Sequence, residues 1–121
     1  MKQILLVEDD PFLIDIYTTK LKEEGFEVDV AEDGSEALRK LKERKPDLLI
    51  LDIVLPHIDG WALLRKVREN LKLKNLKVII LSNLGQKADV EKGMRFQIEK
   101  YLIKAHFTPG QVIEEIKKTL K

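Results

Sequence analysis

The sequence predicts an α/β fold, a doubly wound parallel sheet of five strands with helices on both faces. The first observation is a set of unbroken apolar runs, at residues 4–7, 48–51, 78–81 and, more weakly, 101–103. Such runs are typical of strands that a parallel sheet buries on both faces. The second is that amphipathic helical segments separate these runs, and the third is that helix-boundary residues stand at the junctions. This alternation of strand and helix favours parallel strands joined by helical crossovers.

One more strand, the second along the chain, is predicted over residues 26–30, with a different pattern. Phe26, Val28 and Val30 alternate there with Glu27 and Asp29. Alternation leaves one face of a strand polar, so this segment is expected at an edge of the sheet.

Four helices are indicated by apolar residues spaced three or four positions apart. Their stripes are Phe12, Leu13, Ile16, Tyr17 and Leu21; Ala37, Leu38 and Leu41; Leu63, Leu64, Val67 and Leu71; and Val112, Ile113, Ile116 and Leu120. Asp10 before Pro11 and Thr108 before Pro109 predict helix starts, Asp59 caps a helix beginning near Gly60, and Gly25 predicts a stop. A further helix over residues 87–96 has the weakest pattern, because it has few apolar positions and contains Gly93.

Length and composition indicate one domain over residues 1–121, long enough to bury a core. Lys and Arg number 22 against 21 Asp and Glu, so the net charge of +1 gives no general attraction to nucleic acid or an anionic membrane. With no cysteine, disulfides and thiolate metal sites are excluded. The apolar run at 4–7 is too short for a signal peptide or a membrane span, so a cytoplasmic location is expected, without direct partners in nucleic acid or membrane.

Polar residues follow the predicted strands where parallel strands end together. Glu8 and Asp9 follow the first strand, Asp52 the third, Ser82 the fourth and Lys104 the fifth. Ligands of doubly wound sheets collect at this edge. If the three acids converge to about 4 Å, each ionised pair repels by about 4 kcal/mol at an effective dielectric near 20. A divalent cation relieves this repulsion, and Mg²⁺ fits better than Ca²⁺, because no EF-hand loop or other clear source of additional oxygen ligands is present.

These segments closely resemble receiver domains of bacterial response regulators, across essentially the whole chain. The residues that carry the resemblance lie in four stretches: residues 4–11 with Glu8-Asp9-Asp10-Pro11, residues 47–60 with Asp52, Pro56 and Gly60, residues 78–82 ending in Ser82, and residues 101–104 ending in Lys104. The resemblance implies a flavodoxin-like fold with strand order 2-1-3-4-5. It also implies a signalling switch in which Asp52 accepts a phosphoryl group from a histidine kinase.

The same resemblance implies a role for each residue at the sheet edge. Glu8, Asp9, Asp52 and the backbone carbonyl of Val54 would hold Mg²⁺, which cancels the repulsion between a carboxylate and an incoming phosphate. Lys104 would supply positive charge to the phosphoryl oxygens, completing a catalytic set of Asp52, Ser82 and Lys104.

The resemblance also implies which residues switch conformation after phosphorylation and which set the lifetime of the phosphorylated state. Ser82 would be drawn toward phosphorylated Asp52, and Tyr101 would turn into the space that this vacates. Val54 and Leu84 stand where family members vary the lifetime of the phosphorylated state. Both are apolar and cannot orient water, so slow self-dephosphorylation is expected. The chain would catalyse its own phosphorylation and dephosphorylation without being a conventional enzyme.

Two departures from the family pattern concern the fifth strand. Ala105 stands where the family usually carries proline after its lysine, and a cis bond before alanine costs roughly 2.5 to 4 kcal/mol. The sequence therefore leaves the conformation of this bond open, and with a trans bond Lys104 would be able to point in a different direction. Gln97-Ile98 replace the usual small Gly-Ala pair, so the surface between the fourth helix and the fifth strand, the family's usual output face, is expected to be atypical.

Three other functions compete with the switch. A phosphatase of the haloacid-dehalogenase kind needs a second aspartate two positions after the nucleophile, where this chain has Val54. A flavodoxin-like flavin binder would cradle phosphate in the first loop, where Glu8-Asp9-Asp10 would repel it. A non-signalling interaction module or engineered scaffold with the receiver fold stays open. Expected partners of a signalling switch are a sensor histidine kinase or phosphotransfer protein, an unknown downstream protein and, after phosphorylation, a second copy of the chain.

Overall fold

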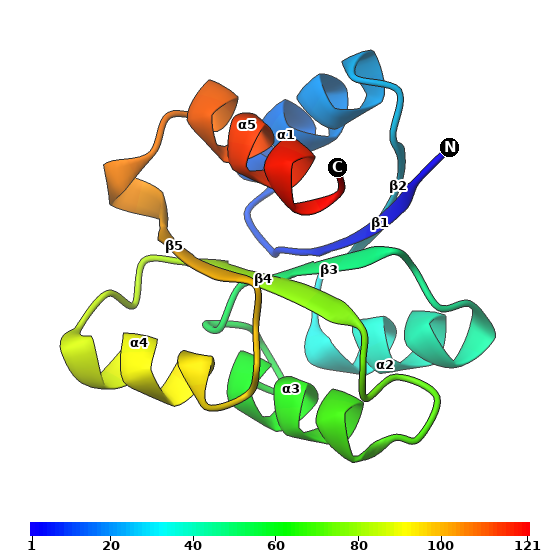
Figure 1. Cartoon of the computed structure of the whole chain (residues 1–121), viewed down its shortest axis with the longest axis vertical. Coiled ribbons are helices and arrows are strands. Elements are labelled where there is room, and N and C mark those ends of the chain that lie inside the picture. Colours follow the sequence, from blue (N-terminus) through cyan, green and yellow to red (C-terminus); the bar gives the residue numbers. More distant parts are fainter.

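A computed structural model describes all 121 residues, which form a parallel sheet of five strands with the order β2-β1-β3-β4-β5 (Figure 1). This confirms the predicted sheet, its strand order and the edge position of the second strand. The strands are β1 (Gln3–Val7), β2 (Glu27–Ala31), β3 (Leu48–Leu51), β4 (Lys77–Ser82) and β5 (Lys100–Ile103).

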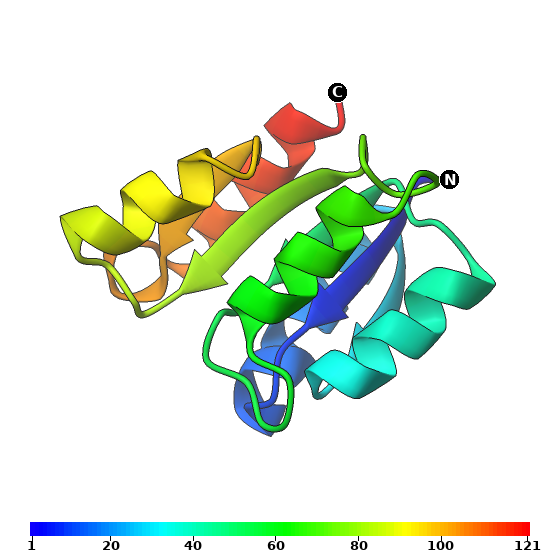
Figure 2. The same ribbon diagram turned by 90° about the horizontal axis from the view of Figure 1, so that it is seen from below.

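Five α-helices cover the sheet on both faces. They are α1 (Pro11–Glu23), α2 (Gly34–Glu43), α3 (Gly60–Glu69), α4 (Lys87–Met94) and α5 (Pro109–Thr119), and a short 3-10 helix spans Lys104–His106. Helices α1 and α5 lie on one face, while α2, α3 and α4 lie side by side on the other (Figures 1 and 2). None of these helices has the length and hydropathy needed to cross a bilayer.

The unbroken apolar strands serve two separate cores, one on each face of the sheet. Leu49 and Leu51 pack in the core beneath α2 and α3, whereas Leu48 and Ile50 pack in the core beneath α1 and α5. All four side chains of β3 are buried. Because successive side chains of a strand point to opposite faces, a strand covered on both sides needs an apolar residue at every position.

The predicted helix boundaries are largely confirmed. Asp10 accepts hydrogen bonds from the backbone N–H groups of Phe12 and Leu13 at 2.9 and 3.4 Å, and Asp59 accepts one from Ala62 at 2.8 Å. Thr108 caps α5 through a reciprocal capping box with Gln111. Gly25 follows α1 with a φ of +88°, a left-handed conformation that glycine adopts without steric strain.

Two residues of the predicted apolar stripes are exposed, which corrects the sequence interpretation. Leu71 is 83% exposed because α3 ends at Glu69. There the side chain of Asn70 accepts a hydrogen bond from the backbone N–H of Lys72 at 2.8 Å, a local turn that competes with helix continuation. Phe12 is 71% exposed in the first turn of α1, ahead of Tyr17, the first buried residue of that helix.

Helix α4 forms despite its weak pattern, and Gly93 has a packing role. A Cβ atom at Gly93 would lie 2.8 Å from Cδ2 of the Tyr101 ring and 3.1 Å from Cδ1 of Ile80. Both distances are shorter than an ordinary van der Waals contact. The glycine therefore allows α4 to approach β5 closely at the position of Tyr101.

The guanidinium of Arg68 joins three segments at the end of α3. It donates hydrogen bonds to the carbonyl oxygens of Phe96 at 2.7 Å, Lys74 at 3.2 Å, Leu76 at 2.8 Å and Gln97 at 3.2 Å. These carbonyls belong to the α3–β4 connection and to the segment between α4 and β5. Burial lowers the pKa of Arg68 from its ordinary range, which reflects the desolvation of its side chain.

Replacement of Arg68 by methionine is expected to lower the free energy of unfolding by about 2 to 3 kcal/mol, because four carbonyl groups lose a charged donor. Equilibrium urea unfolding measures this loss. Arg65→Met on the same helix is the matched control, since Arg65 is exposed and makes no ion pair or side-chain hydrogen bond, and it should change stability by less than about 0.5 kcal/mol. Equal effects of the two substitutions would contradict the anchoring role.

Candidate functional site

The site lies at the carboxyl edge of the sheet, where backbone hydrogen bonds continue beyond the strands. The N–H of Glu8 donates to the carbonyl of Ala31 at 3.0 Å, and the N–H of Asp52 donates to that of Val7 at 3.0 Å. These bonds extend the ladder by one residue past β1 and β3. They fix the backbone of the two acids next to each other on neighbouring strands.

Three acids predicted to converge are brought together. One carboxylate oxygen from each of Glu8, Asp9 and Asp52 lies within 4.8 Å of the others. Glu8 and Asp52 are buried, with relative exposures of 1% and 6%, whereas Asp9 is exposed. Two negative side chains are thus largely removed from water at the bottom of the site, with a third at its rim.

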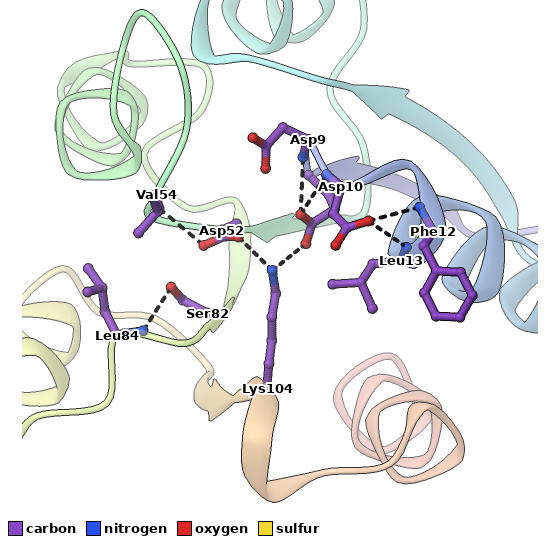
Figure 3. Close-up of polar contacts among 10 residues, drawn as sticks. Asp9, Asp10, Phe12, Leu13, Asp52, Val54, Ser82, Leu84 and Lys104 are labelled. Carbon is purple, nitrogen blue, oxygen red and sulfur yellow. Dashed lines mark hydrogen bonds and ion pairs between the residues drawn. The ribbon is translucent and has the colours of Figure 1, made fainter.

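Lys104 compensates for the two buried charges. Its Nζ lies 2.6 Å from Oδ2 of Asp52 and 2.6 Å from Oε1 of Glu8. Figure 3 shows the side chain extending from the end of β5 to Asp52. The peptide bond before Ala105, which the sequence left open, is trans, since the chain has no cis peptide. With this trans bond the lysine reaches both acids from the 3-10 helix that follows β5.

Burial and ion pairing act in opposite directions on these groups. Burial raises the pKa of Glu8 above its ordinary value, although its hydrogen bond with Lys104 opposes the increase. Burial alone would lower the pKa of Lys104, but the hydrogen bonds to Asp52 and Glu8 outweigh burial and raise it. The lysine is therefore held in its charged form, while Glu8 remains incompletely compensated.

The donor set fits a hard divalent cation. All available side-chain ligands are carboxylate oxygens, which Mg²⁺ prefers, and the cluster contains no sulfur or imidazole. Some oxygens are already engaged: Oε2 of Glu8 accepts from the N–H groups of Asp9 and Asp10 at 3.1 Å each, and Oδ1 of Asp52 accepts from the N–H of Val54 at 3.1 Å. Asp9 makes no ion pair, so its carboxylate is free to bind a cation.

The side chains of Ser82 and Tyr101 both contact Leu84. Ser82 is fully buried, and its Oγ accepts a hydrogen bond from the N–H of Leu84 at 3.3 Å (Figure 3). The hydroxyl of Tyr101 donates to the carbonyl of the same residue. Burial raises the pKa of Tyr101 to about 12, so the phenol remains a proton donor. No hydrogen bond joins Ser82 directly to Asp52.

The remaining predicted residues lie at the rim of the site or beyond it. Val54 is 59% exposed in the loop after Asp52, and Leu84 is half-buried. Gln97 has a φ of +59° in the connection between α4 and β5, so the family's usual glycine is replaced here by a residue in the left-handed region. Ile98 is buried in the core beneath α2 and α3.

Sequence reasoning missed two contacts of the site. The ion pair between Glu8 and Lys104 was not expected, and neither was the bond from the Tyr101 hydroxyl to the carbonyl of Leu84. Each joins a residue of β5 or of the segment after it to a residue that follows another strand. Hydropathy patterns place such residues at one edge of the sheet but contain no signal for the direction of an individual side chain.

Comparison with protein families matches residues 4–117 to the response regulator receiver domain. Among curated relatives, the phosphate regulon transcriptional regulatory protein PhoB of Rhizobium meliloti is 35% identical over 121 residues, which are 100% of this chain and 53% of that protein. The probable transcriptional regulator ycf29 of Porphyra purpurea is 39% identical over 114 residues, 94% of this chain and 54% of that protein. The chain spans about half the length of these relatives.

Solved structures show the same fold. A CheY-like response regulator receiver domain protein from Methanospirillum hungatei aligns with a TM-score of 0.90 and 28% identity, over 99% of this chain and 94% of that one. The receiver domain of the Francisella response regulator 1452 aligns with a TM-score of 0.88 and 30% identity, over 100% of both chains. The match to the family and to these folds covers the sheet and all the strand ends that form the site. The chain therefore belongs to the response regulator receiver domain family of two-component signalling.

Proposed function

We propose that this chain is a phosphoacceptor switch in which Asp52 takes a phosphoryl group from a phosphohistidine of a sensor kinase or phosphotransfer protein. The observation that carries the proposal is the buried carboxylate of Asp52, which lies within a cluster of acids and contacts Lys104 at 2.6 Å. A buried carboxylate at a ligand-binding edge, next to a fixed positive charge, is suited to attack a phosphorus atom. Receiver domains act in this way in general.

The transfer forms one bond and breaks one bond. An oxygen of Asp52 attacks the phosphorus, the bond from phosphorus to the donor imidazole nitrogen breaks, and the imidazole leaves with the electron pair. Glu8, Asp9, Asp52 and the carbonyl of Val54 would hold Mg²⁺, which when bound reduces the repulsion between carboxylate and phosphate. The ammonium of Lys104, already positioned at Oδ2 of Asp52, would balance the charge of the phosphoryl oxygens.

Ser82 and Tyr101 would relay the change. A phosphoryl group on Asp52 adds strong acceptor oxygens, so the hydroxyl of Ser82 gains a charged partner. Its oxygen now accepts from the N–H of Leu84, and the carbonyl of Leu84 accepts from Tyr101. Movement of Ser82 toward Asp52 would therefore shift the Leu84 segment and the ring of Tyr101 together. The altered face between α4 and β5 would then bind a downstream protein or a second copy of the chain.

Incubation with Mg²⁺ and the small donor phosphoramidate, followed by intact mass spectrometry, tests the acceptor. Wild-type protein should gain one phosphoryl group, and Asp52→Asn should gain none, because the amide is not a nucleophile. Asp59→Asn is the matched control, since Asn caps a helix as well as Asp, and it should behave like wild type. Absence of added mass on wild-type protein would favour the alternative of a non-signalling module with the receiver fold.

Replacement of Val54 by asparagine is expected to accelerate loss of the phosphoryl group about fivefold, because one hydrogen bond to an attacking water is worth roughly 1 kcal/mol. Val54 is 59% exposed beside Asp52, so the new amide would face both water and the phosphoryl group. The decay of phosphorylated protein after removal of the donor measures the rate. Val54→Leu keeps the position apolar and should leave the rate unchanged. An unchanged or slower rate in the asparagine variant would refute the hypothesis that the apolar side chain of Val54 keeps self-dephosphorylation slow.

A further inference from the structure

A basic groove with an exposed leucine lies at the amino ends of the strands, opposite the proposed phosphorylation site. The groove has a volume of about 550 Å³ and lies between the end of α2 and the connection from α3 to β4. Both segments lie at the end of the molecule where the strands begin (Figure 1). Lys42, Lys45 and Lys72 line it, together with Leu71.

The charge of this groove is not neutralised within the chain. Lys42, Lys45 and Lys72 are exposed, and none of them lies within 4.0 Å of a carboxylate oxygen. The one acidic residue of the lining, Glu43, already pairs with Arg39 at 3.0 Å. The whole chain has a net charge of only +1, whereas the lining of this groove has four basic residues and one acidic residue.

The apolar component of the groove is also unpartnered. Leu71 is 83% exposed beyond the end of α3, while Leu41 and Leu73, which line the same groove, are 3% and 5% exposed. An exposed leucine in a groove that three unpaired lysines also line is complementary to a ligand that combines negative charge with an apolar side chain. The turn formed by Asn70 and Lys72 holds Leu71 in this outward position.

We propose that this groove binds an acidic peptide segment of a partner protein, with an apolar side chain of the peptide on Leu71 and its carboxylates on the three lysines. A nucleic acid fits less well. The groove contains no aromatic side chain on which a base could stack, and its single arginine, Arg44, already contacts Glu27 at 3.4 Å. The groove is separate from the phosphorylation site and does not depend on phosphorylation.

Fluorescence anisotropy with a labelled synthetic peptide of repeating Glu-Glu-Leu units tests the proposal. Wild-type protein should bind the peptide, and the double variant Lys45→Glu/Lys72→Glu should bind at least tenfold more weakly. Leu71→Ser should weaken binding at least fivefold. Lys87→Glu reverses the charge of one exposed lysine at the start of α4, near the other end of the sheet, which is half the charge change of the double variant, and it should alter affinity by less than twofold. Because all these residues are exposed, the variants should keep the thermal midpoint of wild type within about 3 °C.

Three results would overturn the proposal. The first is absence of binding to wild-type protein at low ionic strength. The second is equal binding of a Glu-Glu-Ser peptide, which would leave Leu71 without a role. The third is tighter binding of a single-stranded oligonucleotide of the same charge, which would assign the groove to nucleic acid.

Discussion

Replacement of Lys104 by methionine is expected to lower the free energy of unfolding by about 3 to 5 kcal/mol at pH 7 in the absence of divalent cations. Methionine preserves the apolar stem but removes the ammonium, which lies 2.6 Å from both Glu8 and Asp52. Both carboxylates are buried and would face each other without a counter-charge. Urea unfolding followed by circular dichroism, with EDTA present, measures the effect.

The loss of stability in this variant should depend on pH. Burial raises the pKa of Glu8 above its ordinary value of 4.5, and removal of Lys104 eliminates a hydrogen bond that lowers it. A carboxyl group whose pKa is raised by folding stabilises the fold below its unfolded pKa, and this contribution disappears as the pH rises through the folded pKa. The stabilities of wild type and Lys104→Met should therefore converge below pH 4.5 and separate as the pH rises toward neutrality.

A triple variant separates loss of charge from loss of packing. Glu8→Gln/Asp52→Asn/Lys104→Met removes both carboxylates together with the ammonium, so no uncompensated charge remains buried. It should recover more than half of the stability lost by Lys104→Met alone. A loss below about 1 kcal/mol in the single variant, or an equal loss in both variants, would show that the ammonium does not stabilise this site.

Most of the fold was predictable because burial determines the hydrophobic pattern. The run 48–51 predicted a strand covered on both faces, and its side chains do alternate between two cores. The end of α3 was not predictable from periodicity, since Leu71 continues the spacing of Val67. The helix ends because the side chain of Asn70 competes for the backbone, a local interaction that an apolar stripe does not report.

The site also combines features that the sequence predicted with features that it did not. The positions of Glu8, Asp9 and Asp52 followed from a general rule, since the carboxyl ends of parallel strands meet at one edge of a sheet. The ion pair between Lys104 and Glu8 did not follow, because it depends on the backbone path after β5. Outside the site, the anchoring role of Arg68 was also not predicted, because it too depends on the path of the connecting backbone. A basic residue in the last turn of a helix is expected simply from the helix dipole, and nothing in the sequence signals four carbonyl partners.

Replacement of Gly60 by alanine is also expected to cause a large loss of stability, lowering the free energy of unfolding by about 3 kcal/mol. A Cβ atom at this first residue of α3 would lie 2.5 Å from Cα of Ile53 and 2.7 Å from the carbonyl oxygen of Asp52. Both neighbours are backbone atoms, so neither can move aside by a change of rotamer. The start of α3 must instead separate from the loop that follows β3, and the hydrogen bond from the Gly60 N–H to the Ile53 carbonyl, now 2.8 Å, should lengthen.

Gly110→Ala is the matched control, with an expected effect of opposite sign. Gly110 lies in the first turn of α5, and its Cβ would meet only Oγ1 of Thr108, at 3.9 Å. Alanine should therefore stabilise the fold by about 0.5 to 1 kcal/mol, because it restricts the unfolded chain and favours the helix. Since the clash at Gly60 includes the carbonyl of Asp52, its alanine variant should also accept a phosphoryl group more slowly, while the Gly110 variant keeps the wild-type rate. A Gly60→Ala protein as stable as wild type would mean that the loop carrying Asp52 tolerates displacement of α3.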